Sequence, residues 1–465
     1  MITRYNSVYF VGAGGIGMAA LERFFLSLGK KVAGYDRTAT ELTRNLEKEG
    51  AEIVYEESAS LIPDYCKDKE TTLVIYTPAI PNEHEGLCYF RDNGFTIMKR
   101  AQVLGLITNS SKGICFAGTH GKTTTSSMAG NIMHNSPLGC NAFLGGVLKP
   151  YNSNLLLSPG TEFSVIEADE FDRSFHWLKP YIAVITATDP DHLDIYGHEE
   201  NYLESFAHFT ELIREDGYLI VHEGLKLKPR PAAGVKTFTY SRHEGDFHAE
   251  NIRKGNGEIT FDFVHPSGVI KDVKLGVPVD INIDNAIASM AACHIAGVAD
   301  EDLKNGIASF GGAKRRFDFW LKEPGKPVLI DDYAHHPDEL KASIKSVKDL
   351  YPGRKVHVIF QPHLYSRTKD FAPQFAEALS QADEVWLTEI YPARELPIPG
   401  VTSEIILNDI KCNNKSICEK KFLIDRIKNH NFDILLTVGA GDVCDYLPAI
   451  CEILKERNGR RFLNI

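Results

Sequence analysis

The sequence has no pair of cysteines in the C-x-x-C spacing, although it contains nine cysteines in all. An odd number of cysteines without paired spacing provides no disulfide framework and suits a reducing compartment. No apolar run approaches the roughly 20 residues that a membrane-spanning helix needs. Residues 1–10 lack the layout of a secretory signal peptide, because their apolar run leads directly into a glycine loop. We therefore expect a cytoplasmic globular protein with no membrane partner.

The chain also lacks an excess of positive charge. Its 51 lysines and arginines are outnumbered by 62 acidic residues, which gives a formal net charge of −11. This balance argues against a nucleic-acid partner. The apolar fraction of 43% is ordinary for a folded protein, and 465 residues are too many for one hydrophobic core. We expect roughly two to four domains.

The most informative stretch is a glycine loop, A-G-T-H-G-K-T-T-T at residues 117–125. It follows an apolar run that predicts a buried strand (residues 113–116) and precedes helix-like apolar spacing (residues 126–133). Backbone N–H groups at the start of a helix bind phosphate, and Lys122 can reach the terminal phosphates. The Thr123 hydroxyl is then placed to bind Mg²⁺. The first glycine of a standard Walker A motif is missing, since Phe116 occupies its place, so a plain glycine turn with a solvated lysine is the alternative.

A second glycine loop lies near the N-terminus. Residues 8–11 predict a strand, Gly12–Gly17 satisfies G-x-G-x-x-G, residues 18–28 predict a helix and residues 32–35 a second strand that ends at Asp36. Alone, this pattern favours a dinucleotide site with Asp36 on the ribose. Any nucleoside diphosphate can use such a turn, so a UDP-type ligand, or no ligand, remains an alternative. Further strands are predicted at 73–76 and 96–98, and a polar link follows at 108–112. We place the end of a first domain, residues 1–108, at this link.

The second block carries two acidic clusters at predicted strand ends. Residues 163–166 lead to Glu167–Asp172, and residues 182–186 lead to Thr188–Asp194. Open α/β sheets bind ligands at this edge, so these carboxylates and His192 are candidate metal ligands. Acid-rich capped loops with a surface histidine are the alternative. Residues 217–275 predict a small β-rich insert, and we end this domain (109–316) after a basic stretch that contains Arg316.

The third block, residues 317–465, returns to α/β alternation. Predicted strands at 328–330, 356–360, 385–387 and 434–438 each end in a polar cluster, so this domain also faces a ligand. Two adjacent histidines, His335 and His336, raise the question of zinc. No third ligand or cysteine follows them at a suitable spacing.

Six strings, taken together and in this order, resemble the Mur ligase family over essentially the whole chain. They are G-T-H-G-K-T at 118–123, E-A-D-E at 167–170, D-P-D-H-L-D at 189–194, R-R-F-D at 315–318, D-D-Y-A-H-H-P at 331–337 and F-Q-P-H at 360–363. The resemblance implies an α/β protein of three domains. These are a Rossmann-like N-terminal domain that binds a UDP-sugar, a central P-loop ATPase-like domain with a β-rich insert, and a Rossmann-like C-terminal domain on the amino-acid and ribose side.

The activity implied by this resemblance is ATP-dependent ligation of L-alanine to the lactyl carboxylate of UDP-N-acetylmuramate. An acyl phosphate forms first, and ADP and phosphate are released in a step of peptidoglycan precursor synthesis. The Q-P-H and Y-S-R-T segments at 361–363 and 365–368 favour this member over the relative that attaches a ready-made tripeptide for wall recycling. A phosphate-loop ATPase switch with a partner-binding domain and a UDP-sugar sensor are further alternatives. A monomer or weak homodimer is expected.

The resemblance also implies roles for individual residues. It gives catalytic roles to Lys122, Glu167, His192 and Arg316, and ATP contacts to Gly118, Thr119, Gly121, Lys122, Thr123, Thr124, Asn282, Asn285, Arg316 and Asp332. Thr123 and Glu167 would hold one Mg²⁺, and His192 with Glu167 a second metal, for which Mn²⁺ can substitute. The UDP-sugar contacts are Gly14, Gly15, Arg100 and His120, and the L-alanine contacts are Tyr333, His335, His363 and Arg367. The chain departs from the family pattern at Ala187, Ile281 and Leu364.

Overall fold

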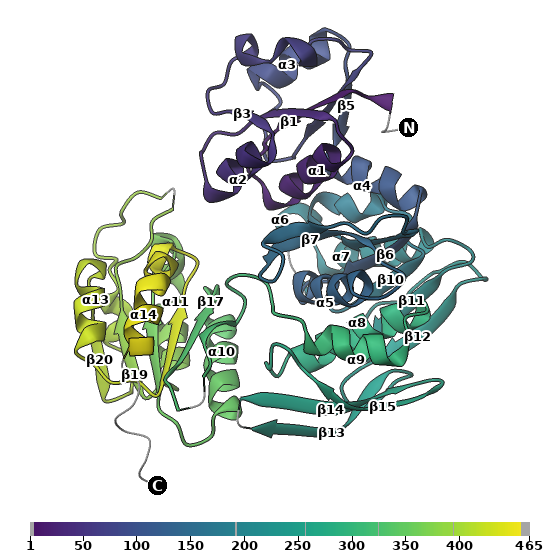
Figure 1. Cartoon of the computed structure of the whole chain (residues 1–465). Helices are drawn as coiled ribbons and strands as arrows, with labels where there is room; N and C mark the ends of the chain where they lie inside the picture. Colours follow the sequence, from purple (N-terminus) through teal and green to yellow (C-terminus); the bar gives the residue numbers. More distant parts are fainter. Residues whose placement is uncertain (1–3, 191–192, 256, 324, 394, 457–465) are drawn as a thin grey trace. The chain divides into compact units, whose positions relative to one another are not determined.

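The computed structural model describes residues 4–190, 193–255, 257–323, 325–393 and 395–456. The chain divides into two compact units. Figure 1 labels the helices and strands along the chain. Unit 1 contains residues 1–252, 261–276 and 281–311. Unit 2 contains residues 253–260, 277–280 and 312–465.

The first sheet of unit 1 is entirely parallel and has the strand order β3-β2-β1-β4-β5. Its strands are β1 (Ser7–Val11), β2 (Lys31–Tyr35), β3 (Glu52–Val54), β4 (Thr72–Tyr76) and β5 (Thr96–Lys99). The helices of this part are α1 (Ile16–Ser27), α2 (Glu41–Glu49), α3 (Glu85–Asp92) and α4 (Arg100–Asn109). The strand order reverses beside β1, so the glycine loop that follows β1 lies at the position where such sheets bind ligands.

The second sheet of unit 1 has the order β12-β11-β10-β6-β9-β7-β8, and only β8 runs antiparallel to its neighbour. Its strands are β6 (Lys112–Ala117), β7 (Asn141–Leu148), β8 (Ser153–Leu156), β9 (Phe163–Glu167), β10 (Ile182–Ile185), β11 (Tyr218–His222) and β12 (Lys236–Tyr240). Its helices are α5 (Lys122–His134), α6 (Leu193–Tyr196), α7 (Glu199–Glu211), α8 (Asn282–Ile295) and α9 (Asp300–Ala308). The central strands are apolar runs because both faces of a parallel sheet are covered.

Two details differ from the sequence-based expectation. Only part of residues 217–275 forms a separate β-rich insert, the three-stranded sheet of β13 (His248–Gly255), β14 (Glu258–His265) and β15 (Gly268–Lys274). Strands β11 and β12 instead extend the central sheet, since their short alternating pattern suits its edge. The polar link expected at 108–112 is also shorter, because α4 continues to Asn109 and β6 begins at Lys112.

Unit 2 is built on one sheet with the order β16-β17-β21-β18-β19-β20, in which only β16 is antiparallel to its neighbour. Its strands are β16 (Asp318–Leu321), β17 (Val328–Asp332), β18 (Val356–Phe360), β19 (Glu384–Leu387), β20 (Asn414–Ile417) and β21 (Ile434–Val438). Its helices are α10 (Pro337–Leu350), α11 (Tyr365–Leu379), α12 (Glu404–Leu407), α13 (Lys420–Lys428) and α14 (Leu447–Glu456). The carboxyl ends of β17, β21 and β18 are neighbours, which brings their polar clusters to one edge.

Candidate functional site

Strand order explains why three polar segments of unit 1 meet. Strand β6 leads into the glycine loop, and its two neighbours are β9 and β10. Phe116 pairs with Glu167 on one side, and Ala117 pairs with Ile185 on the other. The two segments that the sequence marks as acidic clusters therefore begin on either side of the phosphate loop.

The loop conformation requires its glycines. Gly118 and Gly121 have φ angles of +144° and +83°, which side chains rarely adopt. A methyl group on Gly118 would also lie 2.8 Å from the backbone nitrogen of Ala187. The loop is fixed by Thr119, whose N–H donates to the Ala187 carbonyl (3.0 Å) and whose hydroxyl donates to the Asp189 carbonyl (2.7 Å). Helix α5 begins directly afterwards, so its free N–H groups are available to an anion.

Lys122 has a buried acidic partner. Its Nζ donates to Glu170 Oε1 (2.7 Å) and to the Gly118 carbonyl (2.7 Å). Only 1% of the Glu170 side chain is exposed, and this burial raises its pKa, although the Lys122 charge acts in the opposite direction. From the sequence, Glu170 was one of the candidate metal-ligating carboxylates that follow β9, and its contact with Lys122 was not predicted.

Glu167 lies between the phosphate loop and β7. Its Oε1 accepts a hydrogen bond from the Thr123 hydroxyl (3.1 Å), and its Oε2 accepts one from the Gly145 N–H (3.1 Å). Burial raises the pKa of Glu167, while these hydrogen bonds lower it. A hydroxyl and a carboxylate are the oxygen ligands that Mg²⁺ prefers, so the pair fits such an ion. The third predicted metal ligand, His192, lies outside the described residues.

The two asparagines predicted on the adenine side lie beside the same loop. Asn285 Oδ1 accepts from the Thr125 hydroxyl (3.2 Å), and its amide donates to Asn282 Oδ1 (3.1 Å). A methyl group on Gly121 would lie 2.8 Å from Asn285 Oδ1. Helix α8, which carries both asparagines, is held on α5 by a hydrogen bond from the Ser289 hydroxyl to the Thr125 carbonyl (2.9 Å).

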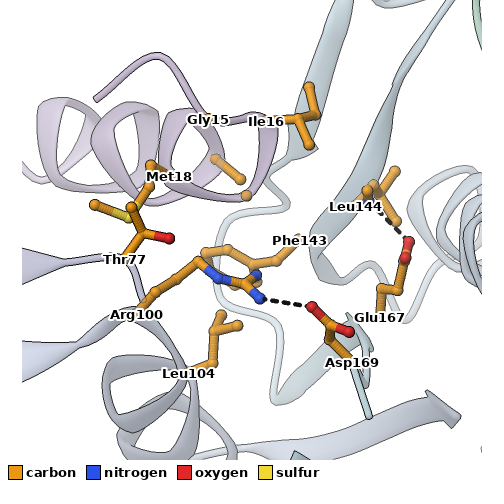
Figure 2. A pocket seen from close by; sticks show the side chains of 13 residues that line it. Gly15, Ile16, Met18, Thr77, Arg100, Leu104, Phe143, Leu144, Glu167 and Asp169 are labelled. Carbon is orange, nitrogen blue, oxygen red and sulfur yellow. Dashed lines mark hydrogen bonds and ion pairs between the residues drawn. The ribbon is translucent and has the colours of Figure 1, made fainter. Parts of the chain in front are cut away.

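A cavity of about 300 Å³ joins the N-terminal glycine loop to Glu167. Figure 2 shows Arg100 reaching across it toward Asp169, with 3.4 Å between Nη2 and Oδ2, and Glu167 on the central-sheet side. The residues that line it are Gly15, Ile16, Gly17, Met18, Ala20, Thr77, Arg100, Leu104, Phe143, Leu144, Gly145, Glu167 and Asp169. Of the four residues predicted to contact a UDP-sugar, Gly15 and Arg100 line this cavity, whereas Gly14 and His120 are not among its lining residues.

Asp36 does not behave as a free ribose ligand. Its Oδ2 accepts the Gly14 N–H (2.7 Å), and its Oδ1 accepts the Thr38 N–H (3.1 Å). The carboxylate therefore supports the glycine loop from the end of β2. The sequence favoured a dinucleotide site partly because Asp36 could bind a ribose. Since its carboxylate is already hydrogen-bonded to the loop, that argument no longer favours such a site.

In unit 2 the two aspartates at the end of β17 accept hydrogen bonds from other segments of the same unit. Asp331 is fully buried and accepts a hydrogen bond from the Thr437 hydroxyl (2.7 Å). Asp332 accepts hydrogen bonds from the Ser343 hydroxyl and from the Phe317 N–H (3.3 Å). The guanidinium of Arg316 lies 5.7 Å from the centre of the Tyr333 ring. Arg316 and Asp332, both predicted to contact ATP, thus lie at the same edge of this sheet.

The residues predicted to contact L-alanine also gather at this edge. The ring of His335 lies 5.2 Å from that of Tyr333 and 5.9 Å from that of His363, between ring centres. Burial lowers the pKa of His363, and the nearby charges of Arg367 and His335 lower it further. Helix α10 explains the position of His335, because its N-cap is His336 and Pro337 is its first residue. Leu364, one of the departures from the family pattern, has a φ of +68° and precedes α11.

We predict that Asp331 makes the stability of the chain fall as the pH rises from about 4 to 6. Burial raises the pKa of Asp331 from 3.8 to about 6, so the folded state keeps a proton that the unfolded state has released. The Asp331 contribution is fully present below pH 4 and is lost above pH 6. The difference corresponds to at most about 3 kcal/mol. Urea unfolding of the Asp331→Asn variant should lack this slope.

The matched control for this prediction is Asp338→Asn, since 91% of that side chain is exposed. Its unfolding should follow that of the parent chain at every pH. If Asp331→Asn and the parent chain show the same dependence on pH between 4 and 7, the proton is not held at Asp331.

Three family models match consecutive parts of the chain. They are described as "Mur ligase family, catalytic domain" (residues 7–112), "Mur ligase middle domain" (116–293) and "Mur ligase, glutamate ligase domain" (315–443). A UDP-N-acetylmuramate–L-alanine ligase from Phocaeicola vulgatus is 58% identical over 457 residues, which cover 98% of this chain and 100% of that relative. No helix in the described part of the chain is both long and apolar enough to span a membrane.

Solved structures show the same architecture. The UDP-N-acetylmuramate–alanine ligase of Thermotoga maritima superposes with a TM-score of 0.80 and 27% identity, covering 97% of this chain and 100% of that chain. A murein peptide ligase from Psychrobacter arcticus has a TM-score of 0.62 and 20% identity, with 96% and 98% coverage, and shares the fold. With domain models along its length and a relative this similar over nearly its full length, the chain belongs to the Mur ligase family.

Proposed function

We propose that this chain uses ATP to join L-alanine to the lactyl carboxylate of UDP-N-acetylmuramate. The names of its relatives give these two compounds as the ones that are joined. The observation that carries the proposal is the cavity in which the N-terminal glycine loop and Arg100 face Glu167. Because Glu167 also contacts Thr123 of the phosphate loop, one end of this cavity adjoins the predicted ATP site. A substrate that fills it can present its carboxylate to the phosphoryl group of ATP.

The reaction has two steps. The substrate carboxylate attacks the γ-phosphorus of ATP, ADP leaves, and an acyl phosphate forms. The amine of L-alanine then attacks the acyl carbon, loses a proton, and displaces inorganic phosphate from the tetrahedral intermediate. Both steps develop negative charge on phosphate oxygens, so they depend on positioned cations and N–H donors.

Residues of unit 1 supply those groups. Lys122 leaves Glu170 to contact the transferring phosphate, and the start of α5 offers its N–H groups to the same anion. Thr123, Glu167 and His192 would hold Mg²⁺, which neutralises phosphate charge when it is bound. Asn282 and Asn285 lie on the adenine side. Gly14, Gly15, Arg100 and His120 contact the UDP-sugar, with the Arg100 guanidinium suited to the diphosphate.

Residues of unit 2 are proposed to contact ATP and L-alanine. Arg316 contacts the ATP phosphates and Asp332 the ribose, while Tyr333, His335, His363 and Arg367 form the L-alanine site. A guanidinium binds the amino-acid carboxylate in two-point contact, which leaves the amine free to react. We also propose the domain limits 1–108, 109–316 and 317–465, with a cytoplasmic location and a monomer or weak homodimer as the working state.

The test is ADP release from ATP and Mg²⁺ with UDP-N-acetylmuramate, with and without L-alanine. Release that requires both substrates and equals the UDP-muramoyl-alanine formed supports the proposal. Release that occurs only with a tripeptide would assign the chain to wall recycling instead. Release that needs neither substrate would leave only an ATPase, and the assignment of unit 2 would be wrong.

A further inference from the structure

A second polar cluster lies at the opposite end of the unit 2 strands from Gln361 and His363. His357 is the second residue of β18, Glu384 is the first residue of β19, and the two are direct partners in the sheet register. His430 follows α13 and precedes β21. None of the three has a role in the proposed ligation.

The geometry of this cluster matches a metal centre. Glu384 Oε2 lies 3.5 Å from His357 Nδ1 and 3.3 Å from His430 Nε2, and the three ligand atoms lie within 4.8 Å of one another. Zinc bonds to nitrogen and oxygen are about 2.0–2.1 Å, so two ligands of a tetrahedral ion lie about 3.3–3.4 Å apart. The separation of 3.3 Å between Glu384 and His430 matches that length, and the separation of 3.5 Å between Glu384 and His357 is slightly longer.

The surroundings hold the carboxylate in place. Glu384 Oε1 accepts a hydrogen bond from the Trp386 indole N–H (2.9 Å), which leaves Oε2 facing both histidines. A carboxylate ligand fixed through its second oxygen is a common feature of protein metal sites.

One ring nitrogen of His357 lacks the hydrogen bond that a buried imidazole normally makes. Only 5% of the side chain is exposed, and within the described residues its buried Nε2 has no hydrogen-bond partner. The other ring nitrogen, Nδ1, lies 3.5 Å from Glu384 Oε2, which places a possible metal-binding nitrogen beside the carboxylate.

We propose that His357, Glu384 and His430 bind a divalent transition-metal ion, with Zn²⁺ as the best fit and water as the fourth ligand. Two imidazole ligands favour zinc over Mg²⁺ or Ca²⁺, which prefer oxygen alone. Glu384 is 21% and His430 33% exposed, which leaves a route for the ion. The ion would link β18, β19 and the segment before β21. The Arg426 guanidinium, 4.0 Å from the Trp386 ring centre, weakens the site by charge repulsion but leaves its geometry intact.

The test uses the full chain without a histidine tag, stripped of metal and dialysed against Zn²⁺. We expect one zinc per chain that Mg²⁺ does not displace, and a melting temperature that rises with Zn²⁺. In Glu384→Gln and His430→Ala, zinc affinity should fall at least tenfold and the melting shift should disappear. Glu384→Gln retains an acceptor for Trp386, so the metal-free variant should melt like the metal-free parent.

The matched control is His294→Ala. His294 belongs to another cluster of two histidines and a carboxylate, with His265 and Asp300, in which the contacts to Asp300 are 3.9 and 4.0 Å. This variant should retain the zinc. The proposal is overturned if the parent binds no zinc, if Glu384→Gln and His430→Ala bind it unchanged, or if His294→Ala loses it equally. Co²⁺ adds a second readout, because its visible spectrum reports four-coordinate binding, and this spectrum should vanish only in the two ligand variants.

Discussion

Lys122→Ala should lose the phosphoryl-transfer step almost completely while it binds UDP-N-acetylmuramate nearly as well as the parent chain. Lys122 follows the glycine loop, and its Nζ lies 2.7 Å from the Gly118 carbonyl oxygen of that loop. Removing one positioned donor from a charged transition state typically reduces the rate by about 10²–10³-fold. Lys122 is not among the residues that line the cavity beside Arg100, so the sugar nucleotide keeps its contacts.

The measurement pairs a rate with an affinity. ADP release in the presence of both co-substrates reports the chemistry, and calorimetric titration of UDP-N-acetylmuramate without ATP reports the binding. Lys112→Ala is the matched control, since Lys112 begins β6 and its Nζ pairs with the exposed Glu162 (3.2 Å). The control should retain both properties.

The Lys122→Ala variant also removes the ion pair between Lys122 and Glu170. The Glu170 carboxyl group is almost fully buried, and removal of the Lys122 charge takes away an effect that lowers its pKa, so the protonated form is favoured. Some loss of stability is therefore expected. Both assays should be run well below the melting temperature of the variant. If sugar-nucleotide affinity falls as far as the rate does, the division of labour between the two glycine loops is wrong.

The sequence predicted the strands that carry the site because those strands are apolar runs followed by polar residues. Residues 8–11, 163–166 and 434–438 lie in β1, β9 and β21, and each predicted strand agrees with the observed one to within one residue. Glycine spacing likewise identified both loops, since Gly12 in the first loop and Gly118 and Gly121 in the second have φ angles that favour glycine.

The contacts within the site were not predictable in the same way, because they depend on strand order. The Gly145 N–H reaches Glu167 only because β7 pairs with β9, although 22 residues separate the two positions. No local pattern marks Gly145 as part of the site. The same reason explains the error at residues 217–275, where alternation predicted strands but could not show that β11 and β12 join the central sheet.

Gly145→Ala should abolish most of the activity with little change in stability. A methyl group at Gly145 would lie 2.7 Å from the Glu167 carboxyl carbon and 2.7 Å from its Oε1. Those atoms are the end of a flexible side chain, so Glu167 can rotate away without disturbing the fold. The displaced carboxylate would lose its hydrogen bonds with Gly145 and Thr123, both 3.1 Å long. We expect kcat to fall about 10²-fold or more, because small displacements in an active site cost that much.

A double-mutant cycle shows whether the loss acts through Glu167. Glu167→Ala alone should also remove most of the activity, and Gly145→Ala should add almost nothing to it, because both changes remove the same carboxylate. Gly268→Ala is the control, since the atoms nearest to its new methyl group belong to His265 at 3.7 Å, an ordinary contact distance. It should match the parent in activity and melting temperature. If the losses from Gly145→Ala and Glu167→Ala were additive, Gly145 would act independently of Glu167. In that case Gly145 would contact the substrate itself, and β7 would serve substrate binding rather than the positioning of Glu167.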